Sequence, residues 1–305
     1  MKRISIFLGI FLLIYLLGLS SHFIYLYSYP CCGVSQFITY FPSHNAQIIL
    51  SNVTPCESKT IYQQRFSFCG RSREFTSYLS KDGEFLLRFF NTRSSVDPSW
   101  FIEWKGLKKI ASIPFIFDTY FSKKKRFNVL SQKFSHAFKD LSMETGLLDV
   151  QLEPHNNAAT EIELEEENHE VFKINLMNYP HVVQKYADPL FVYFDRMIQQ
   201  EEIQYLKQSL ASLCDLFYLR AKKGYTDQKK INEFVLGFKE GVAQQLEVVG
   251  LSKCEKGYAQ PFDELKKKYE ELKFIIICRY PELDMFLSKL IQEKLDLYKI
   301  DVDFI

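Results

Sequence analysis

Four of the seven cysteines lie close together in the sequence and are the residues best suited to covalent chemistry. They are Cys31, Cys32, Cys56 and Cys69, whereas Cys214, Cys254 and Cys278 are scattered. An even cluster of cysteines is typical of a disulfide set in a chain exported to an oxidising compartment. Adjacent cysteines rarely bond each other because the geometry is strained, so we expect Cys31 and Cys32 each to pair with Cys56 or Cys69. The alternative is palmitoylation of Cys31 and Cys32, which requires both on the cytoplasmic side.

Histidine and carboxylate spacing gives no metal or cofactor motif. The sequence contains no His-x-x-x-His, no His-Glu-x-x-His and no Cys-x-x-Cys pattern. His155 and His169 flank one predicted hairpin with Glu163 and Glu165 nearby, and we interpret these histidines as surface residues on turns. The sequence also lacks a nucleophile elbow and a glycine-rich phosphate loop. We therefore expect no metal and no cofactor, and we assign no catalytic residue.

One Asp-x-Asp motif is present, at Asp301-Val302-Asp303. Two such carboxylates can hold a divalent cation against a sugar-nucleotide diphosphate, because hard cations prefer oxygen ligands. No nucleotide-binding βα pattern precedes the motif, so we interpret it as a frayed acidic terminus. A type II membrane enzyme such as a glycosyltransferase is the alternative to a non-enzymatic role.

The residues most informative about location are at the start of the chain. Residues 4–56 contain no Asp, Glu, Lys or Arg, and residues 4–28 are almost continuously apolar. About 20 apolar residues in a helix cross the hydrocarbon core of a bilayer. Lys2 and Arg3 precede this run, and the positive-inside rule then keeps the N-terminus cytoplasmic. We expect a single-pass signal anchor with the bulk of the chain extracytoplasmic; the alternatives are a secreted protein with a cleaved signal peptide, or a buried core helix.

Two short motifs indicate surface sites. Asn52-Val53-Thr54 matches the acceptor for N-glycosylation in exported chains. Lys123, Lys124, Lys125 and Arg126 form a basic run suited to an anionic partner such as lipid headgroups. The simpler interpretation of this run is a solvated helix start.

The overall composition is that of an ordinary globular protein. The 305 residues include 38 Lys+Arg and 37 Asp+Glu, and 47% are hydrophobic, which excludes disordered and supercharged classes. A net charge of +1 gives no argument for a nucleic-acid partner, so we expect none. The net charge is small because a basic half and an acidic half of the chain cancel. Residues 1–150 contain 18 Lys+Arg and 10 Asp+Glu, whereas residues 151–305 contain 20 Lys+Arg and 27 Asp+Glu.

Apolar periodicity predicts an α+β fold. Short runs over residues 57–118 predict strands, with Asp82-Gly83 as a hairpin turn and residues 113–117 as an edge strand. Spacings of three and four over residues 127–141 predict a helix that ends at Gly146. Alternation over residues 148–176 predicts three strands in an antiparallel meander beneath that helix.

The chain after Pro189 predicts helices over residues 203–217, 231–249, 262–276 and 283–297, although residues 274–278 fit a strand equally well. The expected architecture is an N-terminal transmembrane helix, an antiparallel sheet with a packed helix, and a helical C-terminal layer. We divide the chain into an anchor (1–29), an extracytoplasmic β-rich α+β domain (30–188) and a helical region (189–305). By elimination we expect an interaction or scaffolding role, with the lipid bilayer and an unidentified protein as partners.

Overall fold

The computed structural model describes residues 49–72, 74–91, 114–152, 160–231, 235–254 and 259–303; for residues 49, 55–56, 114–126, 177 and 302–303 it describes the backbone alone. The expected anchor over residues 1–29 lies outside these residues and stays a prediction. Within the described part of the chain, no helix combines the length and the apolar character needed to cross a membrane.

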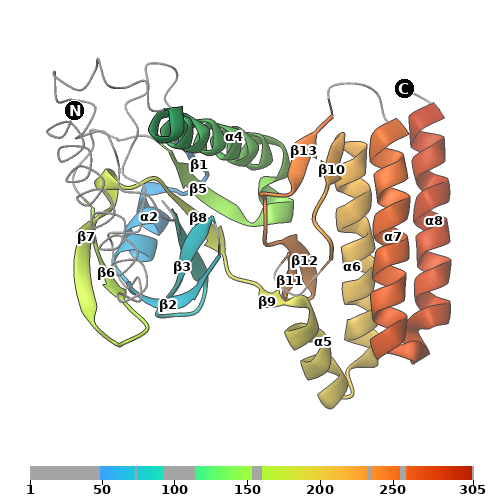
Figure 1. Cartoon of the computed structure of the whole chain (residues 1–305). Helices are drawn as coiled ribbons and strands as arrows, with labels where there is room; N and C mark the ends of the chain where they lie inside the picture. Colours follow the sequence, from blue (N-terminus) through green and yellow to red (C-terminus); the bar gives the residue numbers. More distant parts are fainter. Residues whose placement is uncertain are drawn as a thin grey trace, which may run out of the picture.

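An eight-stranded sheet forms the N-terminal part of the fold (Figure 1). Its order is β1-β5-β8-β4-β3-β2-β6-β7. The strands are β1 (Ile49–Ser51), β2 (Arg65–Arg71), β3 (Phe75–Ser80), β4 (Phe85–Phe90), β5 (Leu147–Gln151), β6 (Glu161–Glu165), β7 (Val171–Asn175) and β8 (His181–Lys185). The α+β class is confirmed, and the sheet is mixed because β2 and β6 run parallel. The expected purely antiparallel sheet is therefore wrong: the long chain between β2 and β6 permits the crossover that parallel neighbours need.

The hairpin and meander predictions have different outcomes. The Asp82-Gly83 turn is confirmed between β3 and β4, where Gly83 has a φ of 76° and Asp82 Oδ1 accepts a hydrogen bond from the Glu84 amide. The β6–β7 hairpin is also present. The meander is wrong because β5 pairs with β1 and β8, and not with β6. Alternation identifies which residues form a strand, but it does not identify the neighbouring strand.

Helix α4 (Pro114–Thr145) covers one face of the sheet. Phe127, Phe134 and Leu141 pack against Phe90 and Val150 in a shared core. The predicted helix is confirmed, and it ends at Gly146, whose φ is 65°. The predicted edge strand at 113–117 is wrong: α4 begins at Pro114, and proline suits the first helical turn because amides there have no intrahelical partner.

The opposite face is covered by the short helix α2 (Pro55–Tyr62). Thr54 caps this helix together with Glu57, each side chain bonding the other residue's backbone amide. Ile61 on α2 packs with Phe66, Leu87 and other apolar side chains of this face in a second core.

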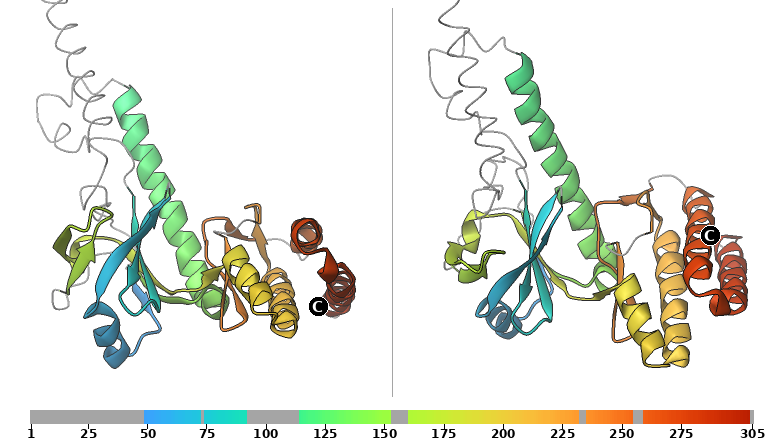
Figure 2. Two further views of the ribbon diagram at one scale, coloured as in Figure 1. Left: turned by 90° about the horizontal axis from the view of Figure 1, so that it is seen from below. Right: turned by 60° about the horizontal axis from the view of Figure 1, so that its bottom comes forward.

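Four helices dominate the C-terminal part: α5 (Leu190–Gln199), α6 (Ile203–Lys222), α7 (Ala259–Arg279) and α8 (Asp284–Asp303). Figure 2 shows them grouped beyond the C-terminal end of α4. The short helices η3 (Leu176–Asn178) and η4 (Pro281–Leu283) precede β8 and α8. The predicted helices at 203–217, 262–276 and 283–297 are confirmed, and residues 274–278 are helical.

The predicted helix over 231–249 is wrong. This stretch holds the hairpin β11 (Leu236–Lys239) and β12 (Val242–Gln245). Glu240 and Gly241 turn the chain with φ values of 51° and 80°. Both faces of β11 are buried, so its sequence lacks the alternation that distinguishes a strand from a helix. The remaining strands are β9 (Asp188–Pro189), which pairs with β11, and β10 (Tyr225–Asp227), which pairs with β13 (Leu251–Lys253).

A polar seam joins the sheet to the helical part. Gln184 on β8 donates hydrogen bonds to the carbonyls of Thr145 (2.5 Å) and Gln245 (3.1 Å). Tyr225 and Leu251, from the small β10–β13 ribbon, share the core beneath α4. The two parts therefore pack through both polar and apolar contacts.

Candidate functional site

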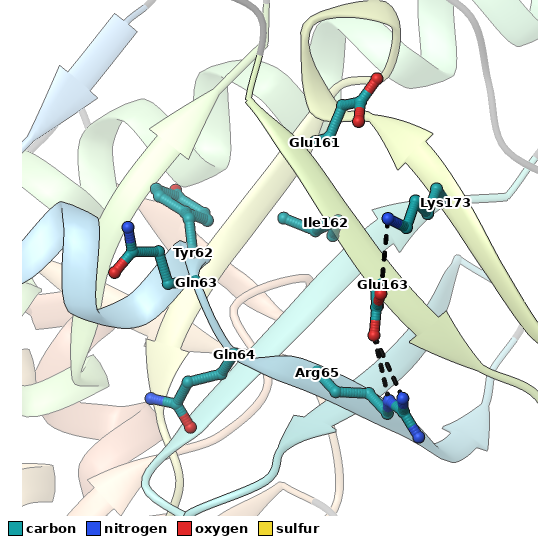
Figure 3. A pocket seen from close by; sticks show the side chains of 8 residues that line it. All are labelled: Tyr62, Gln63, Gln64, Arg65, Glu161, Ile162, Glu163 and Lys173. Atoms are coloured by element: carbon teal, nitrogen blue, oxygen red, sulfur yellow. Dashed lines mark hydrogen bonds and ion pairs between the residues drawn. The ribbon is translucent and has the colours of Figure 1, made fainter.

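A hollow of about 280 Å³ lies where the end of α2 meets strands β2, β6 and β7 (Figure 3). Its position follows from register, because Arg65 lies opposite Glu163 in the parallel β2–β6 pair and Glu163 lies opposite Lys173 in the β6–β7 hairpin. The lining residues are Tyr62, Gln63, Gln64, Arg65, Glu161, Ile162, Glu163 and Lys173.

The charged groups of the hollow are paired with one another. Glu163 Oε2 accepts hydrogen bonds from Arg65 Nε (3.3 Å) and NH2 (3.2 Å), and Glu163 Oε1 lies 3.7 Å from Lys173 Nζ. All three side chains are solvent-accessible, so these ion pairs are weak and can exchange partners. The hollow therefore suits a polar ligand that hydrogen-bonds to amides and charged groups of both signs.

A buried polar cluster lies beneath Tyr62. The Tyr62 hydroxyl donates to Asp149 Oδ2 at 2.5 Å, and Gln151 Nε2 donates to the same oxygen at 3.3 Å. The Tyr62 ring also meets the His181 ring edge-on, with 6.2 Å between centroids. Asp149 is 3% exposed and His181 is 1% exposed. Helix α2 thus ends on two buried titratable groups.

The protonation state of His181 follows from its neighbours. His181 Nδ1 lies 2.9 Å from the carbonyl oxygen of Tyr179, so Nδ1 donates its proton there and Nε2 is left as an acceptor. Among the described residues, neither His181 Nε2 nor Asp149 Oδ1 has a hydrogen-bond partner. Burial lowers the pKa of His181, although the nearby Asp149 carboxylate opposes this. His181 is therefore neutral at neutral pH.

The predicted cysteine cluster is only partly described. Cys69 on β2 is exposed and forms no disulfide with another described cysteine. Cys56 lies in the first turn of α2, but its side chain is outside the description, as are Cys31 and Cys32 altogether. The disulfide set stays a prediction.

The two predicted surface motifs lie on separate elements. Asn52 is exposed in the link between β1 and α2, next to the Thr54 cap. Lys123, Lys124, Lys125 and Arg126 lie in α4, where the structure describes their backbone alone. Glycosylation at Asn52 and an anionic partner at the basic run both stay predictions.

Of the remaining polar candidates, His169 and Asp301 form ion pairs and hydrogen bonds within the protein. His169 pairs with Glu165 at 3.0 Å, while His155 lies outside the described residues. Asp301 accepts hydrogen bonds from the Tyr218 hydroxyl and, at 2.6 Å, from Lys222, and the Lys222 bond is the main cause that lowers the pKa of Asp301. This half of the Asp-x-Asp motif therefore ties α8 to α6. The described ranges contain no group of three His, Cys, Asp or Glu side chains able to hold a metal ion.

The outer helices expose large apolar side chains at one end. Phe274 on α7 is 71% exposed and Met285 on α8 is 86% exposed, and the exposed Cys278 lies one turn after Phe274. An exposed ion pair between Lys273 Nζ and Asp284 Oδ1 (3.5 Å) bridges the two helices. We name Phe274, Cys278 and Met285 the α7–α8 corner. Figure 1 places α7 and α8 on the side of the helical part away from the eight-stranded sheet.

Sequence reasoning missed both the buried cluster and the α7–α8 corner. Asp149 and His181 meet through sheet register, Tyr62 reaches them through the packing of α2, and no local pattern marks the three residues. Phe274 lies in an apolar run that fits a helix or a strand equally well, and its position on the outer face of α7 exposes it.

No known protein-family model matches the chain, and comparison with curated proteins finds no similar sequence. Function is therefore inferred from the chain's own residues.

Proposed function

We propose that the protein is a membrane-anchored, extracytoplasmic interaction or scaffolding protein. The uncharged run over residues 4–56, preceded by Lys2 and Arg3, supports an N-terminal anchor with the bulk of the chain beyond the membrane. The cluster of four cysteines after the anchor fits an oxidising compartment. The bilayer is one partner, and a protein is the other.

The α7–α8 corner is the observation that carries the protein-binding part of this proposal. Contiguous exposed apolar surface is typical of protein interaction sites, whereas single exposed apolar side chains are common on any surface. Phe274 and Met285 are both exposed near the connection between α7 and α8. Burying a side chain such as Phe or Met contributes roughly 1.5–3 kcal/mol. We therefore infer that Phe274 and Met285 contribute to the centre of a modest interface.

A photo-crosslinking experiment on the full chain in its native membrane tests this surface. A photoreactive residue replaces Met285 in one variant and Met143 in the other. Met143, on α4, is an equally exposed methionine at 86%, so it is a matched control. We expect a protein adduct from position 285 and none from position 143. No adduct at 285, or equal adducts at both positions, contradicts a binding surface at this corner.

Alkaline carbonate extraction of the same membranes tests the anchor separately. An anchored chain stays in the pellet, and its domain is protected from protease in sealed vesicles of the correct orientation. Release of a soluble chain whose mature N-terminus lies near Ser21 shows instead a secreted protein with a cleaved signal peptide.

A further inference from the structure

The register of β5 and β8 brings two buried titratable groups together. Gln151 lies opposite His181 and Asp149 lies opposite Val183, so Asp149 and His181 are diagonal neighbours on one face of the sheet. Asp149 Oδ1 and His181 Nε2, two of the buried polar atoms that lack a partner among the described residues, belong to this pair. Tyr62 covers the pair, bonding one residue and packing edge-on against the other.

Protonation of His181 destabilises the buried arrangement of Tyr62, Asp149 and His181. A buried imidazolium is unfavourable unless water or a strong acceptor solvates it. Asp149 is the charged neighbour of the new Nε2–H donor, but its attraction does not outweigh the burial of the imidazolium, and the pKa of His181 is lowered. The charged ring therefore favours any conformation that admits water.

The covering element that moves most easily is α2. The strands that flank His181 are β4 and β5, which lie within the sheet and are paired on both sides. Helix α2 has only eight residues, and its buried described side chain is Ile61, with Tyr62 half-buried at its end. Moving Tyr62 breaks its bond to Asp149 and its ring contact with His181, whereas moving a strand breaks a whole ladder of backbone hydrogen bonds.

We propose that Tyr62, Asp149 and His181 form an acid-sensitive latch: neutral His181 keeps α2 docked on the sheet, and protonated His181 releases its end. Tyr62 also lines the hollow beside Arg65 and Glu163, so release of the latch enlarges that hollow. The latch thus couples pH to access at the hollow, and it is independent of the function proposed above.

The groups facing His181 are few. Asp149 from β5 is the facing carboxylate, Tyr62 from α2 provides a phenol, and β4 provides the uncharged Phe89 ring. Glu57 and Lys59 of α2 are exposed to solvent. The proton responsible for the switch is therefore that of His181.

Hydrogen–deuterium exchange of the full chain at pH 7.5 and pH 5 tests the latch, after correction for the intrinsic effect of pH on exchange. We expect protection of the α2 amides to fall by up to about tenfold for each pH unit below the pKa of His181, while α6 stays protected. His181→Gln is expected to abolish this pH response. His169→Gln, which removes an exposed histidine, is expected to keep it.

Two further measurements do not depend on the folding of the His181 variant. Tyr62→Phe is expected to lower α2 protection already at pH 7.5, because it removes the bond to Asp149. Histidine NMR of the unaltered chain is expected to show one ring that titrates below the ordinary histidine value of about 6.5. Constant α2 protection across this pH range, or an equal loss in His181→Gln, overturns the proposal.

Discussion

Arg220 and Asp227 form a buried ion pair where α6 meets β10, with 3.5 Å between Arg220 NH1 and Asp227 Oδ2. Burial lowers the pKa of Arg220, and the Asp227 carboxylate opposes that shift. Gln245 completes the cluster by donating to Asp227 Oδ2 (3.1 Å) and accepting from Arg220. The pair therefore sits inside a satisfied polar network at the seam between the sheet and the helical part.

Asp227→Ala is expected to destabilise the fold by about 3–5 kcal/mol, because it leaves the Arg220 charge buried without its partner. Urea unfolding monitored by circular dichroism measures this change. Glu163→Ala is the control, since it breaks only exposed ion pairs, those with Arg65 and Lys173, and is expected to change stability by less than about 1 kcal/mol. Equal effects of the two substitutions contradict the role assigned to the buried pair.

Asp140 is expected to make stability depend on acid pH. Its carboxylate accepts hydrogen bonds from Lys253 (2.5 Å) and Tyr225 (2.7 Å), and the Lys253 bond is the main cause that lowers the pKa of Asp140. A lowered pKa in the folded state means that the stabilisation is present above the ordinary value, about 3.9, and is lost as pH falls through the folded value. Asp140→Asn should therefore lower Tm at pH 7 and have little effect near pH 2. A Tm difference that is constant with pH contradicts this linkage.

Gly237 is expected to tolerate no side chain. A Cβ atom there would lie 2.6 Å from the Asp188 carbonyl oxygen and 2.8 Å from Leu246 Cδ1, in the pairing of β9 with β11. Gly237→Ala is therefore expected to cost about 1–3 kcal/mol through overpacking. Gly83→Asn is the contrast, because that turn is open and asparagine tolerates its positive φ; thermal unfolding of both variants tests the difference.

Three cysteines are expected to differ in alkylation if the chain is exported. Cys278 is exposed and should react in the native protein, whereas Cys214 should react only after unfolding, because burial raises its pKa to about 12. Cys69 should react only after reduction, since we expect it to be disulfide-bonded to a cysteine of the N-terminal cluster. Mass spectrometry of labelled peptides separates the three cases. Alkylation of Cys69 in the native, unreduced protein as fast as that of Cys278 contradicts the predicted disulfide.

Local patterns predicted the elements whose shape depends on near neighbours. The Asp82-Gly83 turn and the helix stripe from Phe127 to Leu141 were correct because turn chemistry and one-sided burial act within a few residues. The stretch 231–249 was predicted wrongly because β11 is buried on both faces, and its apolar spacing happened to fit a helix.

The candidate sites depend on contacts that no local pattern records. Tyr62 and Asp149 are 87 positions apart, and they meet because α2 crosses the sheet face above β5. The Arg65–Glu163 contact likewise depends on the parallel pairing of β2 with β6. Sequence spacing can identify motifs within one helix or strand. These clusters combine residues from several helices and strands, so spacing does not identify them.

The parallel pairing of β2 with β6 has a consequence for how the chain folds. Arg65 and Glu163 are separated by 98 positions, so this junction closes a long loop. Strand β2 also pairs with β3, and β3 pairs with β4. The residues joined in these two pairings lie much closer together in the sequence. Because non-local pairing is slow, the β6–β7 hairpin is expected to join the sheet late, leaving the outer edge of β2 transiently open to pairing with another chain. The same step completes the hollow, so its walls form only when folding of the sheet is finished.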